Sequence, residues 1–216
     1  MNKHAPKAAK VYEIPKRRVD HLLIADLVDN GSRVLDIGCS DGALLQLLRT
    51  NKNIDGRGIE ISQKGVNLCV AKGLSVVHGN ADHDLVNYPD NAFDFAILSQ
   101  TIQATYRPKH VLEQLLRISK KAIVSFPNFG HWYIRTQFFF SGHMPVTTTL
   151  PKTWYETENI HLCTFKDFVQ ICNELEASVD KVIALNNNGY KVGVGLPLFL
   201  KNLIAEQGVF LLKPKA

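Results

Sequence analysis

The sequence contains no apolar run that approaches the roughly 18 residues of a transmembrane helix. Its first eighteen residues are basic, and they lack the apolar core and the small-residue cleavage site of a secretory signal. Both absences exclude membrane insertion and secretion by these routes. We therefore expect a cytoplasmic protein.

Cysteine is also scarce, with four residues in the whole chain. Their spacing includes no CxxC pair and no other metal-binding pattern. We expect reduced, mostly buried thiols and no metal site. The four are Cys39, Cys69, Cys163 and Cys172.

Acidic residues are fewer than basic ones, 20 against 25, which gives a net charge of +5. Much of the excess lies in the first eighteen residues, at Lys3, Lys7, Lys10, Lys16, Arg17 and Arg18. A basic arm can bind nucleic acid, but no basic patch interleaved with aromatics follows this one. We favour a solvated, partly disordered leader and do not expect a nucleic-acid partner.

The rest of the chain, at 45% hydrophobic residues over 216, is enough for one domain with a sizeable core. Strand-like and helix-like patterns alternate along its first half, which favours a parallel sheet covered by helices on both faces. The predicted strands are 33–37, 56–62, 74–79, 93–100 and 121–128, and the predicted helices are 19–29, 41–50, 63–72 and 108–119.

The pattern changes after residue 128. Segment 129–163 has no clean period and is rich in aromatics, Thr, Gly and Pro, which is typical of a functional loop, a lid or a partner surface. Regularity returns with a helix at 164–175, for which Thr164 is a plausible N-cap. Strands at 179–186 and 208–213 follow, separated by a loop and a short helical piece.

These patterns predict an N-terminal arm and leading helix over 1–30. They predict one α/β domain over 31–216, with a cap inserted at about 129–163.

The stretch 33–48 reads RVLDIGCSDGALLQLL, a strand, a glycine turn and the start of a helix. Gly38 and Gly42 let the backbone pass close to a ligand, because neither has a Cβ. The helix that follows directs backbone N–H groups and its positive dipole end toward that ligand. Asp36 lies at the carboxyl end of the strand, where ligands bind in open α/β sheets.

Two further carboxylates follow the next two strands. Glu60 ends the second strand, where it can accept hydrogen bonds from both hydroxyls of a ribose. Asp82 follows the third strand, where it can accept from an exocyclic amine such as that of adenine. Three acidic groups favour a neutral or cationic nucleoside. A pyrophosphate would place two negative charges beside Asp36 and Asp41, with no Lys or Arg in the turn, so the residues favour S-adenosylmethionine over NAD.

The stretches VLDIGCSDG, GIEIS and GNADHDL resemble the class I S-adenosylmethionine-dependent methyltransferases. That family's motif is acidic-x-Gly-x-Gly-x-Gly; Asp36, Gly38 and Gly42 match it, while Ser40 replaces the middle glycine and fits if its φ is negative. The resemblance implies a Rossmann-like fold with a mostly parallel seven-stranded sheet, helices on both faces and an inserted cap. It implies S-adenosylmethionine or S-adenosylhomocysteine as the cofactor, bound by Asp36, Gly38, Cys39, Ser40, Gly42, Glu60, Ile61, Asn80, Ala81, Asp82 and Ser99.

Three later stretches resemble the MetW family of methionine-biosynthesis proteins more closely. They are SQTIQATYRP, FPNFGHWYIR and GHMPVTTTLPKTWYETENIHLCTFKDF, and the match runs from about Val34 to the C-terminus. The resemblance implies association with the homoserine O-acyltransferase (acetyl- or succinyltransferase) that commits homoserine to methionine. A homodimer is also compatible with it. No methyl acceptor is generally established for this family.

Catalytic residues are not evident from the sequence. The Asn/Asp-Pro-Pro-aromatic motif of amino-methylating relatives is absent after the fourth strand, where residues 99–103 read SQTIQ. Of the three cap histidines, His131, His143 and His161, we expect turn or surface roles, and we retain His161 as the catalytic candidate.

The cap aromatics fit an acceptor pocket, a protein interface or plain core equally well. They are Trp132, Tyr133, Phe138, Phe139, Phe140, Trp154 and Tyr155. Two functions therefore stay open: a partner that regulates homoserine O-acyltransferase, and an S-adenosylmethionine-dependent small-molecule methyltransferase.

Overall fold

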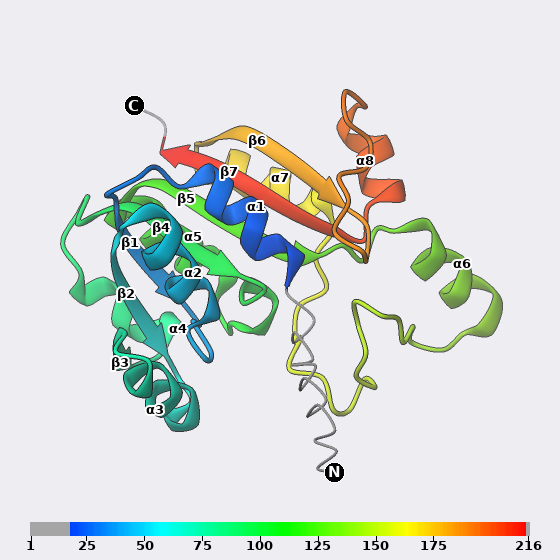
Figure 1. The fold of residues 1–216 in the computed structure, drawn as a ribbon. Helices are drawn as coiled ribbons and strands as arrows, with labels where there is room; N and C mark the ends of the chain where they lie inside the picture. The colour runs from blue at the N-terminus through cyan, green and yellow to red at the C-terminus, as the bar shows by residue number, and fades with distance from the viewer. Residues whose placement is uncertain (1–17, 215–216) are drawn as a thin grey trace, which may run out of the picture.

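The computed structural model describes residues 18–214 and is shown in Figure 1. Its centre is one seven-stranded sheet. The strands are β1 (Arg33–Ile37), β2 (Asp55–Glu60), β3 (Ser75–His78), β4 (Phe93–Ser99), β5 (Ser119–Pro127), β6 (Ala177–Leu185) and β7 (Gln207–Pro214).

Helices connect most of these strands. They are α1 (Val19–Leu27), α2 (Ala43–Lys52), α3 (Gln63–Ala71), α4 (Ala81–Asp84), α5 (Pro108–Ile118), α6 (Trp132–Ser141), α7 (Phe165–Glu174) and α8 (Leu198–Ile204), with 3₁₀ turns η1 (Leu85–Asn87) and η2 (Ile102–Ala104). Every predicted strand and helix is present, with ends that differ by a few residues.

The sheet order is β3-β2-β1-β4-β5-β7-β6. The pairs among β1 to β5 are parallel, and β7 runs antiparallel to both β5 and β6. The predicted α/β fold with a mostly parallel seven-stranded sheet is therefore confirmed.

Two buried clusters lie on the two faces of the sheet. One joins the sheet to α5 and α7, and the other joins it to α1 and α2. Successive side chains of a strand point to opposite faces, so Ala122 and Val124 of β5 join the first cluster and Ile123 joins the second. Figure 1 shows α1 and α2 lying over the same face of the sheet.

The leading helix belongs to this core. Leu23 and Ile24 of α1, and Val28 just after it, are buried in the same cluster as residues of α2 and β4. Of the basic leader, Arg18 alone is described, and it donates hydrogen bonds to Asp20 and Ser99. Arg18 is thus both hydrogen-bonded to the domain and partly exposed, and the other five basic positions lie outside the described residues.

The cap contains a helix that the sequence pattern does not predict. The ten residues of α6 begin at Trp132 and end before Gly142, whose φ of +66° is the left-handed conformation common just after helices. Ile134 is the one buried residue of α6, so no apolar stripe marks it as an amphipathic helix. Figure 1 shows α6 projecting away from the sheet.

The end of the cap is as predicted. Thr164 accepts a hydrogen bond from the backbone N–H of Asp167, and the Asp167 side chain accepts from the N–H of Thr164. This reciprocal pair is a capping box, which fixes the first turn of α7. None of the described helices is both long and apolar enough to span a membrane.

Candidate functional site

The predicted binding residues gather at the carboxyl ends of neighbouring strands. Asp36 of β1 pairs in register with Gly58 of β2 and with Ile97 of β4, and Glu60 and Ser99 end those two strands. Asp36 and Ser99 share the face of the sheet that α1 covers, because each lies two residues from a residue of that cluster. The sheet therefore brings strand ends from distant parts of the chain to one edge.

The two glycines of the turn approach different neighbouring side chains. Both have positive φ, +72° at Gly38 and +75° at Gly42. A Cβ on Gly38 would lie 2.7 Å from the side chain of Thr101, whereas one on Gly42 would lie 2.4 Å from Leu74. Gly42 thus allows the turn to pack closely against Leu74 of the core. We had expected Gly42 to let the backbone pass close to a ligand instead.

Ser40 corrects a second expectation. Its φ is +53°, so the serine occupies the left-handed region that we expected it to avoid. The Ser40 N–H donates a hydrogen bond of 2.8 Å to Oε2 of Glu60. The carboxylate therefore holds the turn in a conformation that a non-glycine residue rarely adopts.

Glu60 is buried and clamps two backbone segments. Its Oε2 accepts from Ser40, and its Oε1 accepts from the N–H of Ser62 at 2.8 Å. An ionised carboxylate offers about four acceptor positions, so two remain for a ligand. This geometry is compatible with ribose binding and adds a structural role.

Asp36 is buried and receives no hydrogen bond from any described residue. Burial raises the pKa of Asp36 to about 7, the Arg18 charge acts in the opposite direction, and the Glu60 and Asp20 charges raise it further. Its ionised form is thus costly in the free protein. A ligand cation beside it would offset that cost.

A network from α1 completes this edge of the site, and sequence reasoning missed it. Arg18 donates to Asp20 at 2.7 Å and to the Ser99 hydroxyl at 2.8 Å. The hydroxyls of Ser99 and Ser125 also donate to Oδ2 of Asp20, at 3.0 and 3.2 Å. Burial acts to raise the pKa of Asp20, but the charge and hydrogen bonds of Arg18, the His21 charge and the Ser99 hydrogen bond together lower that pKa.

Asp41 is paired with a cation, which differs from our expectation that its charge is uncompensated. The ammonium group of Lys72, from the end of α3, lies 2.9 Å from Oδ2 of Asp41. The turn therefore receives a cation from a residue far along the sequence, and Asp41 is not an uncompensated negative charge. Asp36 remains the carboxylate without such a contact among the described residues.

We expected the Asp82 carboxylate to accept a hydrogen bond from a ligand amine, but it already accepts two from the backbone. Its two oxygens accept the backbone N–H groups of Tyr106 and Arg107, at 3.0 and 2.8 Å. The side chain thus anchors the segment between η2 and α5. It also lines a cavity of about 120 Å³, whose walls include Asn80, Ala81 and Ile61.

The thiols near the turn are unsuited to nucleophilic chemistry. Cys39 and Cys69 are buried with their Sγ atoms 4.0 Å apart, and burial is the main cause that raises the pKa of each thiol. Cys39 also packs in the core beneath the turn, so its backbone alone can face a ligand. No group of three or more His, Cys, Asp or Glu residues able to hold a metal occurs in residues 18–214.

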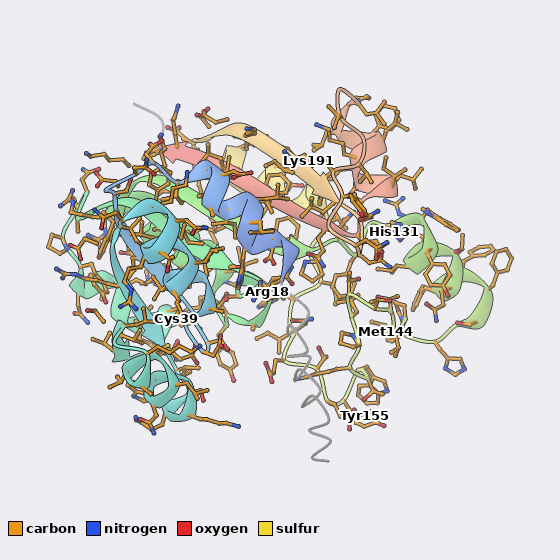
Figure 2. All side chains as sticks on the ribbon, in the orientation of Figure 1. Arg18, Cys39, His131, Met144, Tyr155 and Lys191 are labelled. Carbon is orange, nitrogen blue, oxygen red and sulfur yellow. The ribbon has the colours of Figure 1, made fainter. Side chains whose placement is uncertain are left out.

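The cap histidines differ from one another in their surroundings. The His161 side chain is exposed and forms no hydrogen bond with residues 18–214, while the His161 backbone N–H donates to the Gln103 carbonyl. His131 is buried where α6 meets the domain, as Figure 2 shows. Burial lowers the pKa of His131, and the Glu206 charge acts to raise it. The geometry therefore favours His131 over His161 as the cap histidine that takes part in catalysis or binding.

The cap aromatics are all exposed, so their interpretation as core is wrong. Trp132 and Tyr133 line a second cavity, at the first turn of α6. The remaining five face solvent on the helix end and the loop beyond it, and we call them the aromatic surface: Phe138, Phe139, Phe140, Trp154 and Tyr155.

Comparison with solved structures shows the class of protein. The chain superposes on an S-adenosylmethionine-dependent methyltransferase from Archaeoglobus fulgidus with a TM-score of 0.65 and 18% identity, covering 92% of each chain. It superposes on another from Thermotoga maritima with a TM-score of 0.64 and 17% identity, covering 90% and 87%. The [4+2]-cyclase SpnF also matches, with a TM-score of 0.63, 17% identity and coverage of 93% and 82%. These likenesses establish the class I methyltransferase fold.

Sequence comparison then shows the family. The model of methionine biosynthesis protein MetW matches residues 18–212, and the chain belongs to this family. It is also 29% identical over 174 residues to the bifunctional methionine biosynthesis protein MetXA/MetW of Rhodopirellula baltica. That match covers 76% of this chain and 28% of the relative, so the chain spans little more than a quarter of that protein.

Proposed function

We propose that this MetW-family protein binds S-adenosylmethionine or S-adenosylhomocysteine and associates with homoserine O-acyltransferase in methionine biosynthesis. The ligand part is carried by one observation, the two buried carboxylates Asp36 and Glu60 on adjacent strands. Glu60 keeps acceptor positions for ribose hydroxyls, and Asp36 gains a counter-charge from a sulfonium or an α-ammonium group.

The other ends of the ligand have matching surroundings. The cavity of about 120 Å³ suits the adenine ring, with Asn80 on its wall. Arg18 lies next to Ser99 and is placed to meet the α-carboxylate. Cys39, Ser40 and Gly42 contribute the turn that links these parts, through their backbone.

The partner part is supported by the relative in which a MetXA and a MetW portion share one chain. Covalent fusion keeps two proteins at a high effective concentration, and separate chains need an interface instead. We assign this interface to the aromatic surface, because aromatic side chains are enriched among interface anchors.

Ligand binding and partner binding can be coupled. S-adenosylmethionine is made from methionine, so its level reports the end product of the pathway. A ligand regulates the complex only if it binds the free and complexed protein with different affinity. Regulation can therefore be tested by comparing the ligand affinity of the free protein with that of the complex.

Methyl transfer is the second candidate, favoured by the fold and by the cavity beside His131. The fold alone does not decide it, since SpnF shares that fold and is a cyclase. Release of S-adenosylhomocysteine during incubation with metabolite panels tests this function directly.

Calorimetry of the full chain with S-adenosylmethionine tests the ligand proposal. We expect Glu60→Gln to weaken binding at least tenfold, because one acceptor oxygen becomes a donor. Glu113→Gln, on the exposed side of α5, is the matched control and keeps the native affinity. Equal affinities in both variants would refute the site.

Mixing the chain with purified homoserine O-acyltransferase tests the partner proposal. Size-exclusion chromatography with light scattering detects a complex, and the acyltransferase rate is measured with and without S-adenosylmethionine. We expect a complex at micromolar concentrations and a ligand-dependent rate. Two independently eluting proteins with an unchanged rate would overturn the partnership while leaving ligand binding intact.

A further inference from the structure

A second cavity, of about 490 Å³, lies beside the first turn of α6. Its walls come from four separate segments, 131–134, 146–149, Asn187 and Glu206. None of these residues lines the cavity near Asn80, so the two are distinct. Its size falls within the range of about 300–1,000 Å³ that is typical of small-molecule sites.

This cavity lies at the same edge of the sheet as the nucleoside site, beyond β5. Pro127 at the end of β5 and Leu185 at the end of β6 both pair with Gln207 at the start of β7. Glu206 precedes that residue, and Asn187 follows the end of β6. The strand ends therefore fix the base of the cavity, while α6 and the loop 146–149 form its other side.

Several polar side chains of the lining have no protein partner. Within residues 18–214, no hydrogen bond is formed by the side chains of Glu206, His131 or Asn187. Asn187 is exposed and Glu206 is half-buried, so water can satisfy both in the free protein, and both remain available to a ligand that enters the cavity. The hydroxyls of Thr147 and Thr149 lie 3.2 Å apart on the facing loop.

The charge of the lining selects among ligands. Burial lowers the pKa of His131, so its ring is neutral near pH 7 and Glu206 contributes the one full charge of the lining. No Lys or Arg lines the cavity to receive a carboxylate or phosphate. The aromatic rings of Trp132 and Tyr133 also favour a cation, because it is attracted to the face of a π-system.

We propose that this cavity binds a small organic ammonium ion that also carries a hydroxyl group. Glu206 pairs with the ammonium, and the amide of Asn187 and the imidazole of His131 bond the hydroxyl. This site does not depend on S-adenosylmethionine binding. It gives the chain a second small-molecule ligand.

Three probes of equal length test the charge preference: 4-amino-1-butanol, 1,4-butanediol and 4-hydroxybutyrate. Binding to the full chain is measured by saturation-transfer NMR and by the chemical shifts of labelled tryptophan. We expect the amine to bind at least tenfold more tightly than the neutral or anionic probe. Equal binding of the three, preference for the anion, or no binding at 50 mM would overturn the proposal.

Two variants locate the binding. Glu206→Gln removes the charge, and we expect a loss of at least tenfold in amine affinity; Asn187→Ala, in an exposed loop, gives a smaller loss. Glu113→Gln is the control and leaves amine binding unchanged. All variants are checked for native S-adenosylmethionine binding, so that failure of the amine site and failure of the nucleoside site are separate results. Unchanged amine affinity in Glu206→Gln would refute the assignment.

Discussion

Glu60 accepts the backbone N–H of Ser40 at 2.8 Å, and Ser40 has a φ of +53°. The end of β2 thus holds the turn after β1 in a left-handed conformation. The pair explains how a serine replaces the middle glycine of the motif.

Substitutions at Ser40 test this relationship. Glycine adopts positive φ without steric cost, so we expect Ser40→Gly to change the free energy of unfolding by less than about 1 kcal/mol. Ser40→Val should destabilise by about 1–3 kcal/mol, because a β-branched residue is strained there. Urea unfolding measures both. Equal stability of the two variants would contradict a strained turn.

Asp36→Asn should stabilise the free protein in a pH-dependent way. The pKa of Asp36 in the fold, about 7, lies above its ordinary value of 3.8, so folding favours the protonated form. Ionising Asp36 in the fold therefore lowers the free energy of unfolding. This destabilisation is absent below pH 4, grows from pH 4 to 7 and is complete above pH 7, reaching at most about 4 kcal/mol.

Thermal unfolding of wild type and Asp36→Asn at pH 5 and pH 8 measures this penalty. We expect the variant to gain more at pH 8 than at pH 5. Comparing the two proteins cancels the contributions of Asp20, His21 and His131, whose lowered pKa values are common to both. A gain that is equal at the two pH values would contradict the buried, ionising carboxyl.

Arg18→Ala should weaken binding of the amino-acid end of S-adenosylmethionine. Arg18 contacts Asp20 and Ser99, and 5′-methylthioadenosine lacks the amino-acid group that would lie there. We expect S-adenosylmethionine affinity to fall at least tenfold and methylthioadenosine affinity to stay within about threefold, since ion-paired hydrogen bonds contribute about 1.5–3 kcal/mol. Calorimetry with both ligands measures this. Parallel losses would indicate a structural role for Arg18 instead.

Thr164→Ala should remove the capping box of α7. Loss of the Thr164 side chain leaves the Asp167 N–H without its acceptor, at an expected cost of about 0.5–2 kcal/mol. Thr50→Ala is a matched control, because its hydroxyl bonds a carbonyl within α2, an arrangement that adds little to helix stability. Chemical denaturation compares the two, and equal costs would argue against the cap.

The double change Phe139→Ser and Phe140→Ser should separate stability from association. These side chains are 81% and 82% exposed, so we expect the melting temperature to be retained. Co-elution with homoserine O-acyltransferase should be lost, because exposed aromatics serve as interface anchors. Leu22→Ser, an exposed apolar residue of α1, is the control and should keep the complex. An intact complex in the double variant would place the interface elsewhere.

The sequence predicts much of the fold because each strand and helix of the parallel half carries its own periodicity. Asp36 and Glu60 are predictable as site residues because each stands at the end of a strand, where a parallel sheet gathers polar groups. Thr164 is predictable because a cap is a local pattern.

Other features depend on partners that are distant in the sequence. Asp20 meets hydroxyls that lie 79 and 105 residues away, so no local pattern marks it. Asp82 accepts hydrogen bonds from backbone groups 24 and 25 residues further on, and a sequence shows only that a carboxylate is present. The helix α6 is missed because its aromatics surround the axis rather than forming a stripe.

The place of β7 also constrains the order in which the chain acquires structure. Strands β1 to β5 pair among themselves, whereas β6 pairs with β7 alone among the described strands. During synthesis β6 therefore has no strand to pair with until β7, the last described strand, has been made. Strand β7 then inserts between β5 and β6. The half that carries the glycine turn can form first on the ribosome, and the half that carries Glu206 and its cavity closes last.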